Sequence, residues 1–135
     1  MAFVLDASVT LSWAFPDEQN PIALRAGQLL ESSGETALVP SLWWYEVRNI
    51  LIVNERRGRI TPLRTASFLK ALDELSIVTE FSQDESIVLE LARQSRLTVY
   101  DAAYLALALH QRLPLATLDK DLRDAALAVG VPLLE

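Results

Sequence analysis

The sequence predicts an α/β fold in which a central, mainly parallel sheet of about five short strands carries helices on both faces. Short apolar runs rich in β-branched residues alternate along the chain with longer segments of helical periodicity. Elements that alternate in this way are joined by right-handed crossovers, which make the strands parallel and cover both faces of the sheet. With 135 residues and no repeat, linker or shift in composition, residues 1–135 are expected to form one domain.

In the first half of the chain, turn-forming residues separate two expected strands from three expected helices. Pro16 and Pro40 should end the elements that precede them, and Gly58 should end a long helix. Pro21 suits the first position of a helix, and Ser41 can cap the next one. The expected elements are a strand over 3–5, helices over 8–15 and 21–32, a strand over 36–39 and a helix over 42–57.

The second half continues this alternation with capping residues of the same kinds. Thr61 and Pro62 suit the start of a helix, Ser82 or Asp84 can cap another, and Gly130 should follow the last one. The expected elements are a helix over 62–75, a strand over 77–81, a helix up to 95, a helix over 101–112, a strand over 115–118, a helix from 119 to 129, and a final strand over 131–134.

Composition excludes several classes of protein. Apolar residues make up 51% of the chain and charged residues 22%, which is typical of a globular protein. The lack of cysteine excludes disulfides and cysteine-based zinc sites, and His110 is the only histidine, expected on a helix surface. The N-terminus has no signal-peptide pattern, and the longest apolar run, 102–109, is too short to span a bilayer. A cytoplasmic protein without membrane contact is therefore expected.

The distribution of charge matters more than its total of −6. Between Arg48 and Lys70, six cations face one acid, which leaves that stretch at +5 within an otherwise acidic chain. A local basic patch of this kind can attract the phosphates of a nucleic acid. The alternative is that these cations form the solvated last turn of a helix, where they suit the helix dipole. The RNA-binding candidates are Arg48, Arg56, Arg57 and Arg59.

Two acids follow expected strands directly. Asp6 comes after the strand over 3–5, and Asp119 comes after the strand over 115–118. In open α/β sheets, ligands bind beyond the carboxyl ends of the strands, where the strand order reverses. Either residue could instead cap the helix that follows it, because aspartate is common at that position.

Two further acids lie on helices that are otherwise apolar. Glu46 lies on or beside an apolar stripe formed by Trp43, Val47, Ile50 and Leu51, where an unpaired carboxylate is costly to bury. The alternative is a salt bridge to Arg48 or Arg25. Asp101 opens a helix that has no other charge up to Leu109, so it should point into the interior or a cleft unless it is a plain N-cap.

Several carboxylates can share one cleft only when hard cations neutralise them. Oxygen ligands suit Mg²⁺, with Mn²⁺ as the possible substitute, and such ions activate water and clamp a phosphoryl group. The sequence therefore predicts a catalytic metal site whose ligands are Asp6, Glu46, Asp101 and Asp119. Neutral side chains at the right spacing to orient these acids or the phosphate are Ser8, Asn49 and Thr117. The aromatic run Trp43, Trp44 and Tyr45 favours core or dimer packing over base stacking.

The motifs FVLDASV, VPSLWWYEVRNIL, LTVYDAAYLALA, LATLDKDL and GVPLL occur in this order over nearly the whole chain. With these motifs the chain resembles the PIN-domain ribonucleases, most closely the VapC toxins of bacterial toxin–antitoxin pairs. The resemblance implies Mg²⁺- or Mn²⁺-dependent RNA cleavage, a homodimer, and a cognate antitoxin whose tail covers the active site. The family's four acids fall on the same residues as the predicted ligands, namely Asp6, Glu46, Asp101 and Asp119, and its polar positions on Ser8, Asn49 and Thr117.

Two alternatives stay open within this resemblance. One is a catalytically silent PIN module that binds metal without hydrolysis, and the other is a housekeeping RNA-processing nuclease without an antitoxin. A phosphatase with an aspartate nucleophile is disfavoured, because Ser8 stands where such an enzyme has its second acid. Asp121, a further acid in the last motif, is expected to be solvated or to lie behind the ligands.

Overall fold

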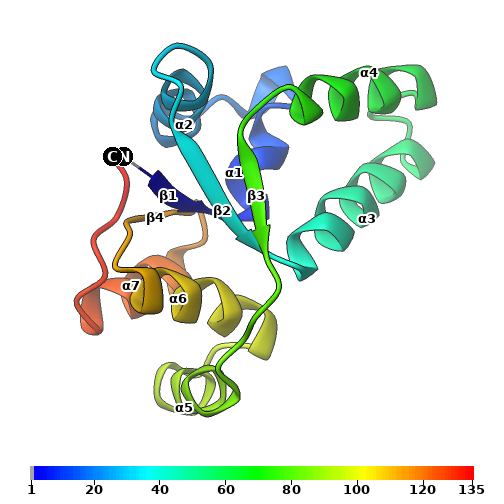
Figure 1. Ribbon diagram of the computed structural model, residues 1–135. Coiled ribbons are helices and arrows are strands. Elements are labelled where there is room, and N and C mark those ends of the chain that lie inside the picture. The colour runs from blue at the N-terminus through cyan, green and yellow to red at the C-terminus, as the bar shows by residue number, and fades with distance from the viewer. Residues whose placement is uncertain (1) are drawn as a thin grey trace.

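The computed structural model describes residues 2–135 and contains one parallel sheet with helices on two sides (Figure 1). The strands lie in the order β3-β2-β1-β4, and every neighbouring pair is parallel. The chain moves outward from β1 through β2 to β3 and then returns to the other side of β1, so the strand order reverses between β1 and β4. The strands are β1 (Ala2–Leu5), β2 (Thr36–Pro40), β3 (Ile77–Glu80) and β4 (Leu115–Ala116).

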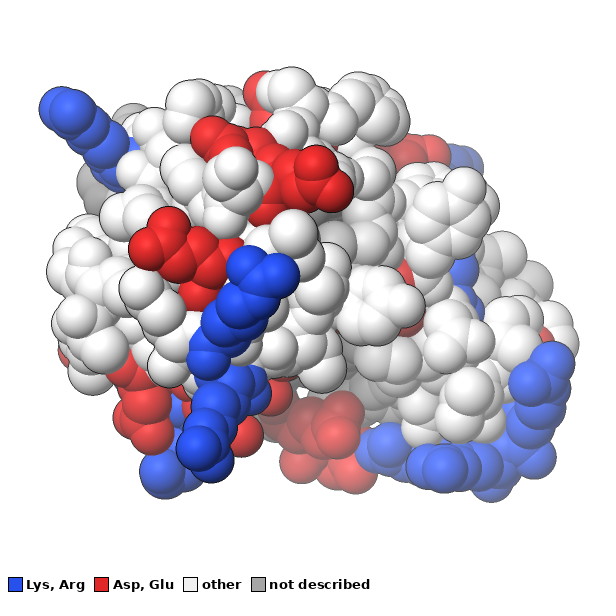
Figure 2. Space-filling view, turned by 90° about the horizontal axis from the view of Figure 1, so that it is seen from below, with Lys and Arg blue, Asp and Glu red and all other residues white. Residues whose placement is uncertain are grey.

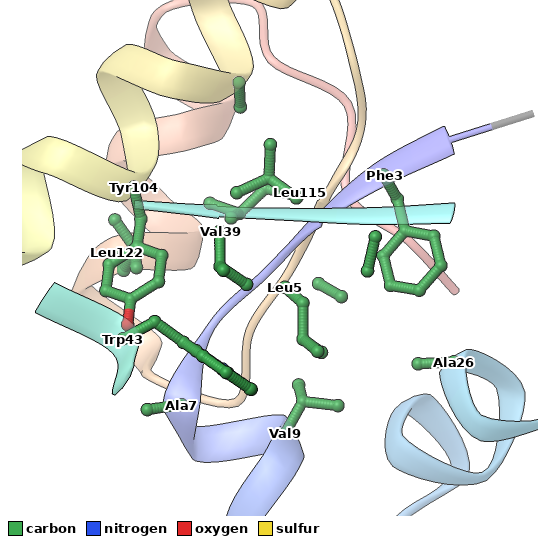
Figure 3. Packing of buried hydrophobic residues seen from close by; sticks show 14 of the residues in the cluster. Phe3, Leu5, Ala7, Val9, Ala26, Val39, Trp43, Tyr104, Leu115 and Leu122 are labelled. Carbon is green, nitrogen blue, oxygen red and sulfur yellow. The ribbon is translucent and has the colours of Figure 1, made fainter. Parts of the chain in front are cut away.

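Seven α-helices of the described chain connect and cover these strands. On one side of β1 and β2 lies α6, and on the other side lie α1 and α2, as the close view of the core shows (Figure 3). The predicted α/β fold with helices on both faces is confirmed. The helices are α1 (Ala7–Ser12), α2 (Pro21–Glu31), α3 (Leu42–Arg56), α4 (Pro62–Asp73), α5 (Glu85–Ser95), α6 (Val99–Gln111) and α7 (Lys120–Ala128), with a 3-10 turn at Pro16–Glu18.

Buried apolar side chains on both faces of the sheet form one hydrophobic core. Phe3 and Leu5 on the central strand β1 are fully buried, because helices cover both faces of that strand. Tyr104 and Leu115 pack on the α6 side, and Val9 packs on the side of α1 (Figure 3). The helix predicted to be buried all round is α6, of which residues 104–108 are all buried.

Helix caps follow the sequence in most places but not all. The side chains of Thr61 and Asp84 accept hydrogen bonds from the first turns of α4 and α5, as predicted. Ser41 was expected to cap α3, but its side chain makes no cap hydrogen bond because its backbone is already helical. Gly58 follows α3 with φ +74°, a left-handed conformation that glycine adopts without strain.

Some element boundaries differ from the prediction for local reasons. The first helix, α1, begins at Ala7 and ends at Ser12, and Pro16 then starts a 3-10 turn that was not expected. Helix α6 begins at Val99, two residues before the predicted start, because the side chain of Thr98 caps it. The predicted start at Asp101 is therefore wrong.

The last predicted strand, over 131–134, is reduced to a single bridge between Leu133 and Leu115. The amide of Leu115 donates to the carbonyl of Pro132, and the amide of Leu134 donates to the carbonyl of Leu115. This ladder cannot extend, because β4 has only two residues and Pro132 has no amide hydrogen to donate. Within residues 2–135 the sheet therefore has four strands, close to the predicted five. None of the described helices is long and apolar enough to cross a membrane.

Arg96 offers a test of the backbone geometry. It ends α5 in the left-handed region, with φ +53°, where a residue with a side chain costs about 1 kcal/mol relative to glycine. The substitution Arg96→Gly is expected to raise the free energy of unfolding by about 0.5–1 kcal/mol, measured by urea denaturation. Arg93→Gly removes the same charge from the last turn of the same helix and should lower stability by about 1 kcal/mol. Destabilisation by both changes would contradict the expectation.

Candidate metal and active site

The four predicted acids lie at the carboxyl edge of the sheet, around the point where the strand order reverses. Asp6 follows β1, and Asp119 stands at the N-cap of α7, three residues after β4. Glu46 lies in the second turn of α3, which follows β2, and Asp101 lies in the first turn of α6. Since β1 pairs with both β2 and β4, these elements bring the acids towards one edge of the sheet.

Asp6 is buried, with 6% of its surface exposed, and two hydroxyl groups hold its Oδ2 atom. The Oγ of Ser8 and the Oγ1 of Thr117 each donate to this atom at 2.7 Å. The same hydroxyl oxygens accept hydrogen bonds from the backbone amides of Leu118 and Asp119, at 3.0 and 3.1 Å. The loops after β1 and β4 are thereby linked through the first acid. Ser8 and Thr117 were both expected from the sequence to orient carboxylates.

The alternative that these aspartates are helix caps applies to only one of them. Asp119 does cap α7, because its Oδ1 accepts a hydrogen bond from the amide of Leu122 at 3.0 Å. Asp6 occupies the N-cap position of α1, but its side chain makes no cap hydrogen bond. Asp101 is not a cap, since Thr98 caps α6 and accepts a hydrogen bond from the amide of Asp101 at 3.1 Å. The carboxylate of Asp101 takes part in none of the described hydrogen bonds or ion pairs.

Glu46 forms no described salt bridge, so the alternative of a pair with Arg48 or Arg25 is excluded for the described structure. Arg48 instead donates to the carbonyl of Trp44 at 3.2 Å and lies 4.0 Å over its ring. The partner of Glu46 is Tyr104, whose hydroxyl donates to Oε1 at 2.6 Å. The contact of Tyr104 with Glu46 was not predicted from the sequence, because a tyrosine ring is expected in the core face of an apolar helix. The available signal was a phenol oxygen three residues after Asp101, on the same face of the helix.

Burial and mutual repulsion raise the pKa values of three of the acids. Desolvation is the largest cause of the raised pKa of Asp6, and the charge of Asp119 adds to it. Desolvation also raises the pKa of Glu46, with smaller contributions from the charges of Asp6 and Asp101. The pKa of Asp101 is raised first by desolvation and then by the charges of Asp119, Asp6 and Asp121. The acids are thus electrostatic neighbours, and Asp121 adds negative charge beside them.

None of the described ion pairs reaches these acids; the cations involved pair with Asp17, Glu18, Asp124 and Glu135. Within residues 2–135, no three acid or histidine side chains are close enough to form a finished set of metal ligands. The donors nevertheless suit a hard cation, because they are all oxygens. Side-chain and amide donors engage one oxygen each of Asp6, Glu46 and Asp119, namely Oδ2, Oε1 and Oδ1. No described hydrogen bond engages the second oxygen of Glu46 or Asp119.

The other residues predicted to belong to the site or to bind RNA differ in their exposure and in their partners. Asn49 is exposed, and none of the described hydrogen bonds involves it. Arg59 pairs with Asp17 at 3.2 Å, donates to Asn54 at 3.0 Å and stacks over Phe15 at 4.6 Å, so it ties loops together. Arg56 and Arg57 are exposed at the end of α3. Figure 2 shows Lys and Arg side chains gathered at the right, the side on which Figure 1 shows α3 and α4.

The aromatic run before Glu46 divides between core and surface. Trp43 is buried, and its indole nitrogen donates to the hydroxyl of Thr10 at 3.0 Å, which fixes α3 against α1. Trp44 and Tyr45 are 50% and 70% exposed and meet edge to face, with ring centroids 5.0 Å apart. Packing in the core is therefore confirmed for Trp43 only. His110 is exposed near the end of α6, as predicted.

The raised pKa values predict how stability depends on pH in metal-free buffer. A carboxyl group with a higher pKa in the folded state binds protons more strongly there, so its protonation favours folding. That contribution is present at low pH and is lost as pH rises from about 4 through the raised folded values. Urea midpoints should therefore decline over this range, and less so in Asp101→Asn. An equal decline in both proteins would argue against repulsion among the acids.

The fold and the site together define a class of protein. The chain belongs to the PIN-domain family, whose sequence model matches residues 3–127. It is 31% identical over 135 residues to Ribonuclease VapC3 from Pyrobaculum aerophilum, and the alignment covers 98% of this chain and all of that protein. The resemblance read from the sequence motifs is thereby confirmed.

Two solved structures share the fold. The crystal structure of PAE2754 from Pyrobaculum aerophilum superposes with a TM-score of 0.72 at 23% identity, covering 93% of this chain and 84% of that one. A toxin–antitoxin complex from Klebsiella pneumoniae contains a chain with a TM-score of 0.60 at 20% identity, with 88% of both chains covered. Because both identities are below 25%, these two structures support the fold of this chain and nothing beyond it.

Proposed function

We propose that the chain is a divalent-metal-dependent endoribonuclease and the toxin component of a toxin–antitoxin pair. The observation that carries the proposal is the placement of four carboxylates, none of which takes part in a described ion pair, at the carboxyl edge of the sheet, where the charges of Asp6, Asp101 and Asp119 raise the pKa values of their neighbours. The name of the relative Ribonuclease VapC3 supports RNA as the substrate. That name and the toxin–antitoxin complex of the same fold motivate the antitoxin partner.

We assign Mg²⁺, with Mn²⁺ as its substitute, to the free oxygens of Asp6, Glu46, Asp101 and Asp119. When bound, the ion supplies a water of lowered pKa and neutralises charge that develops on the phosphate. Ser8 and Thr117 keep Asp6 in place by holding its Oδ2 atom. The carboxylate of Asp101 accepts none of the described hydrogen bonds, so we assign to Asp101 the orientation and deprotonation of the attacking water.

The cations of α3 are unequal candidates for holding the RNA backbone. Arg48 lies two residues after Glu46 and so projects about 200° around the helix from it. Arg57, the C-cap residue, lies eleven residues after Glu46, about three turns and about 16 Å further along nearly the same side of the helix, and Arg56 projects about 80° away from that side. We therefore assign phosphate contacts to Arg56 and Arg57. Arg48 and Arg59, also predicted from the sequence, are engaged within the chain.

The double substitution Arg56→Ala/Arg57→Ala tests this assignment. Two lost phosphate contacts should weaken RNA binding and reduce the slope of log affinity against log salt by about 1.4. The measurement is fluorescence anisotropy on an Asp101→Asn background, which binds RNA without cutting it. Arg59→Ala is the control, because it should lower stability and leave the salt slope unchanged. The assignment fails if the control changes the slope and the double variant does not.

Two other functions fit the same family. A silent PIN module would bind the metal without hydrolysis, and a housekeeping nuclease would cut RNA without an antitoxin. An active enzyme is favoured because none of the predicted catalytic positions is substituted in this chain. The toxin is favoured over the housekeeping nuclease by the name of the VapC relative and by the toxin–antitoxin complex of the same fold. The homodimer and the cytoplasmic location stay predictions from the sequence, and we infer a protein antitoxin as the main partner.

A combined titration and cleavage assay separates these functions. Isothermal titration with Mn²⁺ should show binding, and incubation with RNA and Mg²⁺ should yield fragments that disappear when EDTA is added. Binding without fragments would favour the silent module. Co-expression with the product of a small adjacent reading frame should suppress cleavage if the chain is a toxin. Cleavage that no neighbouring gene product inhibits would point to the housekeeping nuclease.

A further inference from the structure

The hydroxyl group of Tyr104 is the one described partner of Glu46 that approaches from another element. We propose that Tyr104 is a positioning residue, whose hydroxyl holds Glu46 in the conformation that binds the divalent ion. This inference rests on the proposed function, because it concerns the same site. The carrying observation is the 2.6 Å hydrogen bond from the phenol to Oε1 of Glu46, between α6 and α3.

The ring of Tyr104 is fixed in place before any ligand arrives. It is fully buried and lies among core side chains that include Val39, Trp43 and Leu122 (Figure 3). Its hydroxyl, buried with the ring, meets the half-buried Glu46. Tyr104 also follows Asp101 by three residues on α6, so both lie on the same face of one turn. One turn of helix therefore carries a proposed ligand and the group that holds a second ligand.

The phenol of Tyr104 must be protonated to donate its hydrogen bond to Glu46. Burial is the largest cause of a pKa far above the ordinary tyrosine value, and the negative charges of Asp6 and Glu46 raise it further. The hydroxyl therefore keeps its proton at neutral pH and donates a hydrogen bond to Glu46.

Glu46 needs such a partner more than the other acids do. Its side chain has one more rotatable bond than aspartate and is half-buried, so ordering it costs more conformational entropy. Burial is the largest cause of its raised pKa, and repulsion by the charges of Asp6 and Asp101 adds to it. The hydrogen bond from Tyr104 opposes both effects. Because it engages Oε1 only, it leaves Oε2 for the ion.

The substitution Tyr104→Phe removes the hydroxyl and keeps the buried ring. We expect it to weaken Mn²⁺ affinity about 10-fold, the usual range for a group that orients a metal ligand, and to lower RNA cleavage with it. Titration calorimetry measures the affinity. Tyr100→Phe is the matched control, because Tyr100 is on the same helix, is 65% exposed, and takes part in none of the described hydrogen bonds. It should bind Mn²⁺ as the wild type does.

A double-mutant cycle distinguishes positioning from packing. On a Glu46→Ala background, Tyr104→Phe should cause no further loss of Mn²⁺ affinity, because Tyr104 acts through Glu46. A lower melting temperature with unchanged Mn²⁺ affinity would overturn the inference and leave a packing role. An equal loss with and without Glu46 would also overturn it. Wild-type protein that binds Mn²⁺ but cuts no RNA would overturn the proposed function alone, since the affinities still report on Tyr104.

Discussion

Asp101→Asn is expected to lower RNA cleavage on the order of a thousand-fold while the protein stays folded. The substitution keeps the shape of the side chain but removes the charge that we assign to metal binding and to the proton of the attacking water. No described hydrogen bond or ion pair depends on this carboxylate, so its loss breaks none of them. The measurement combines single-turnover cleavage of RNA in Mg²⁺ with urea denaturation of the same protein.

The same variant should be more stable than the wild type when metal is absent. Asp101 is repelled by Asp119, Asp6 and Asp121, and asparagine removes that repulsion. Added Mg²⁺ should raise the melting temperature of the wild type more than that of the variant. Only the wild type has all four carboxylates to bind the ion and to be relieved of their mutual repulsion. Asp124→Asn, a change to an exposed acid paired with Lys120, is the matched control and should keep full activity. Full activity in Asp101→Asn would rule out the role assigned to this residue.

Thr117→Val is expected to be the most destabilising of the proposed single changes. The hydroxyl of Thr117 is fully buried, donates to Oδ2 of Asp6 and accepts from the amide of Asp119. Valine has the same shape but leaves a buried carboxylate short of a donor and an amide short of an acceptor. The expected loss is about 2–4 kcal/mol of unfolding free energy, measured by urea denaturation. Cleavage should fall about 10–100-fold, because Asp6 loses one of the groups that orient it.

Thr79→Val provides a comparison for this change. Thr79 is a half-buried strand threonine in β3 whose hydroxyl takes part in none of the described hydrogen bonds. The same substitution there should change stability by less than about 1 kcal/mol and leave cleavage intact. If the two variants behave alike, the hydroxyl of Thr117 does not support the site. Ser8→Ala should fall between them, because Ser8 is only half-buried.

The sequence was sufficient to predict the features that follow from general rules of parallel sheets. Alternating apolar and helical segments fixed the fold class, and the rule that ligands bind at strand ends pointed to Asp6 and Asp119. Glu46 and Asp101 were conspicuous as charges on apolar helices. Ser8 and Thr117 were named from their spacing, and the structure joins both to one oxygen of Asp6.

The remaining features depend on tertiary contacts that local patterns do not encode. Tyr104 resembled a core residue because its ring is one, and only the position of α3 reveals that its hydroxyl meets Glu46. The prediction of the last strand was wrong because Pro132 cannot donate to a neighbouring strand. The apolar pattern of the segment gave no sign of this missing donor. Arg59 belonged to a basic run in the sequence, yet acids from the loop before α2 engage it.

The hydrogen bond between Thr117 and Asp6 joins residues 111 positions apart. At the rate of about 5–20 residues per second at which chains are synthesised, on the order of ten seconds separate the appearance of the first acid from that of the hydroxyl that secures it. Near the end of that interval the nascent chain contains Asp6, Glu46 and Asp101 but not yet the fourth strand. The proposed cleavage centre is thus among the last parts of the molecule to assemble, and a ribosome holding an incomplete chain carries no finished site.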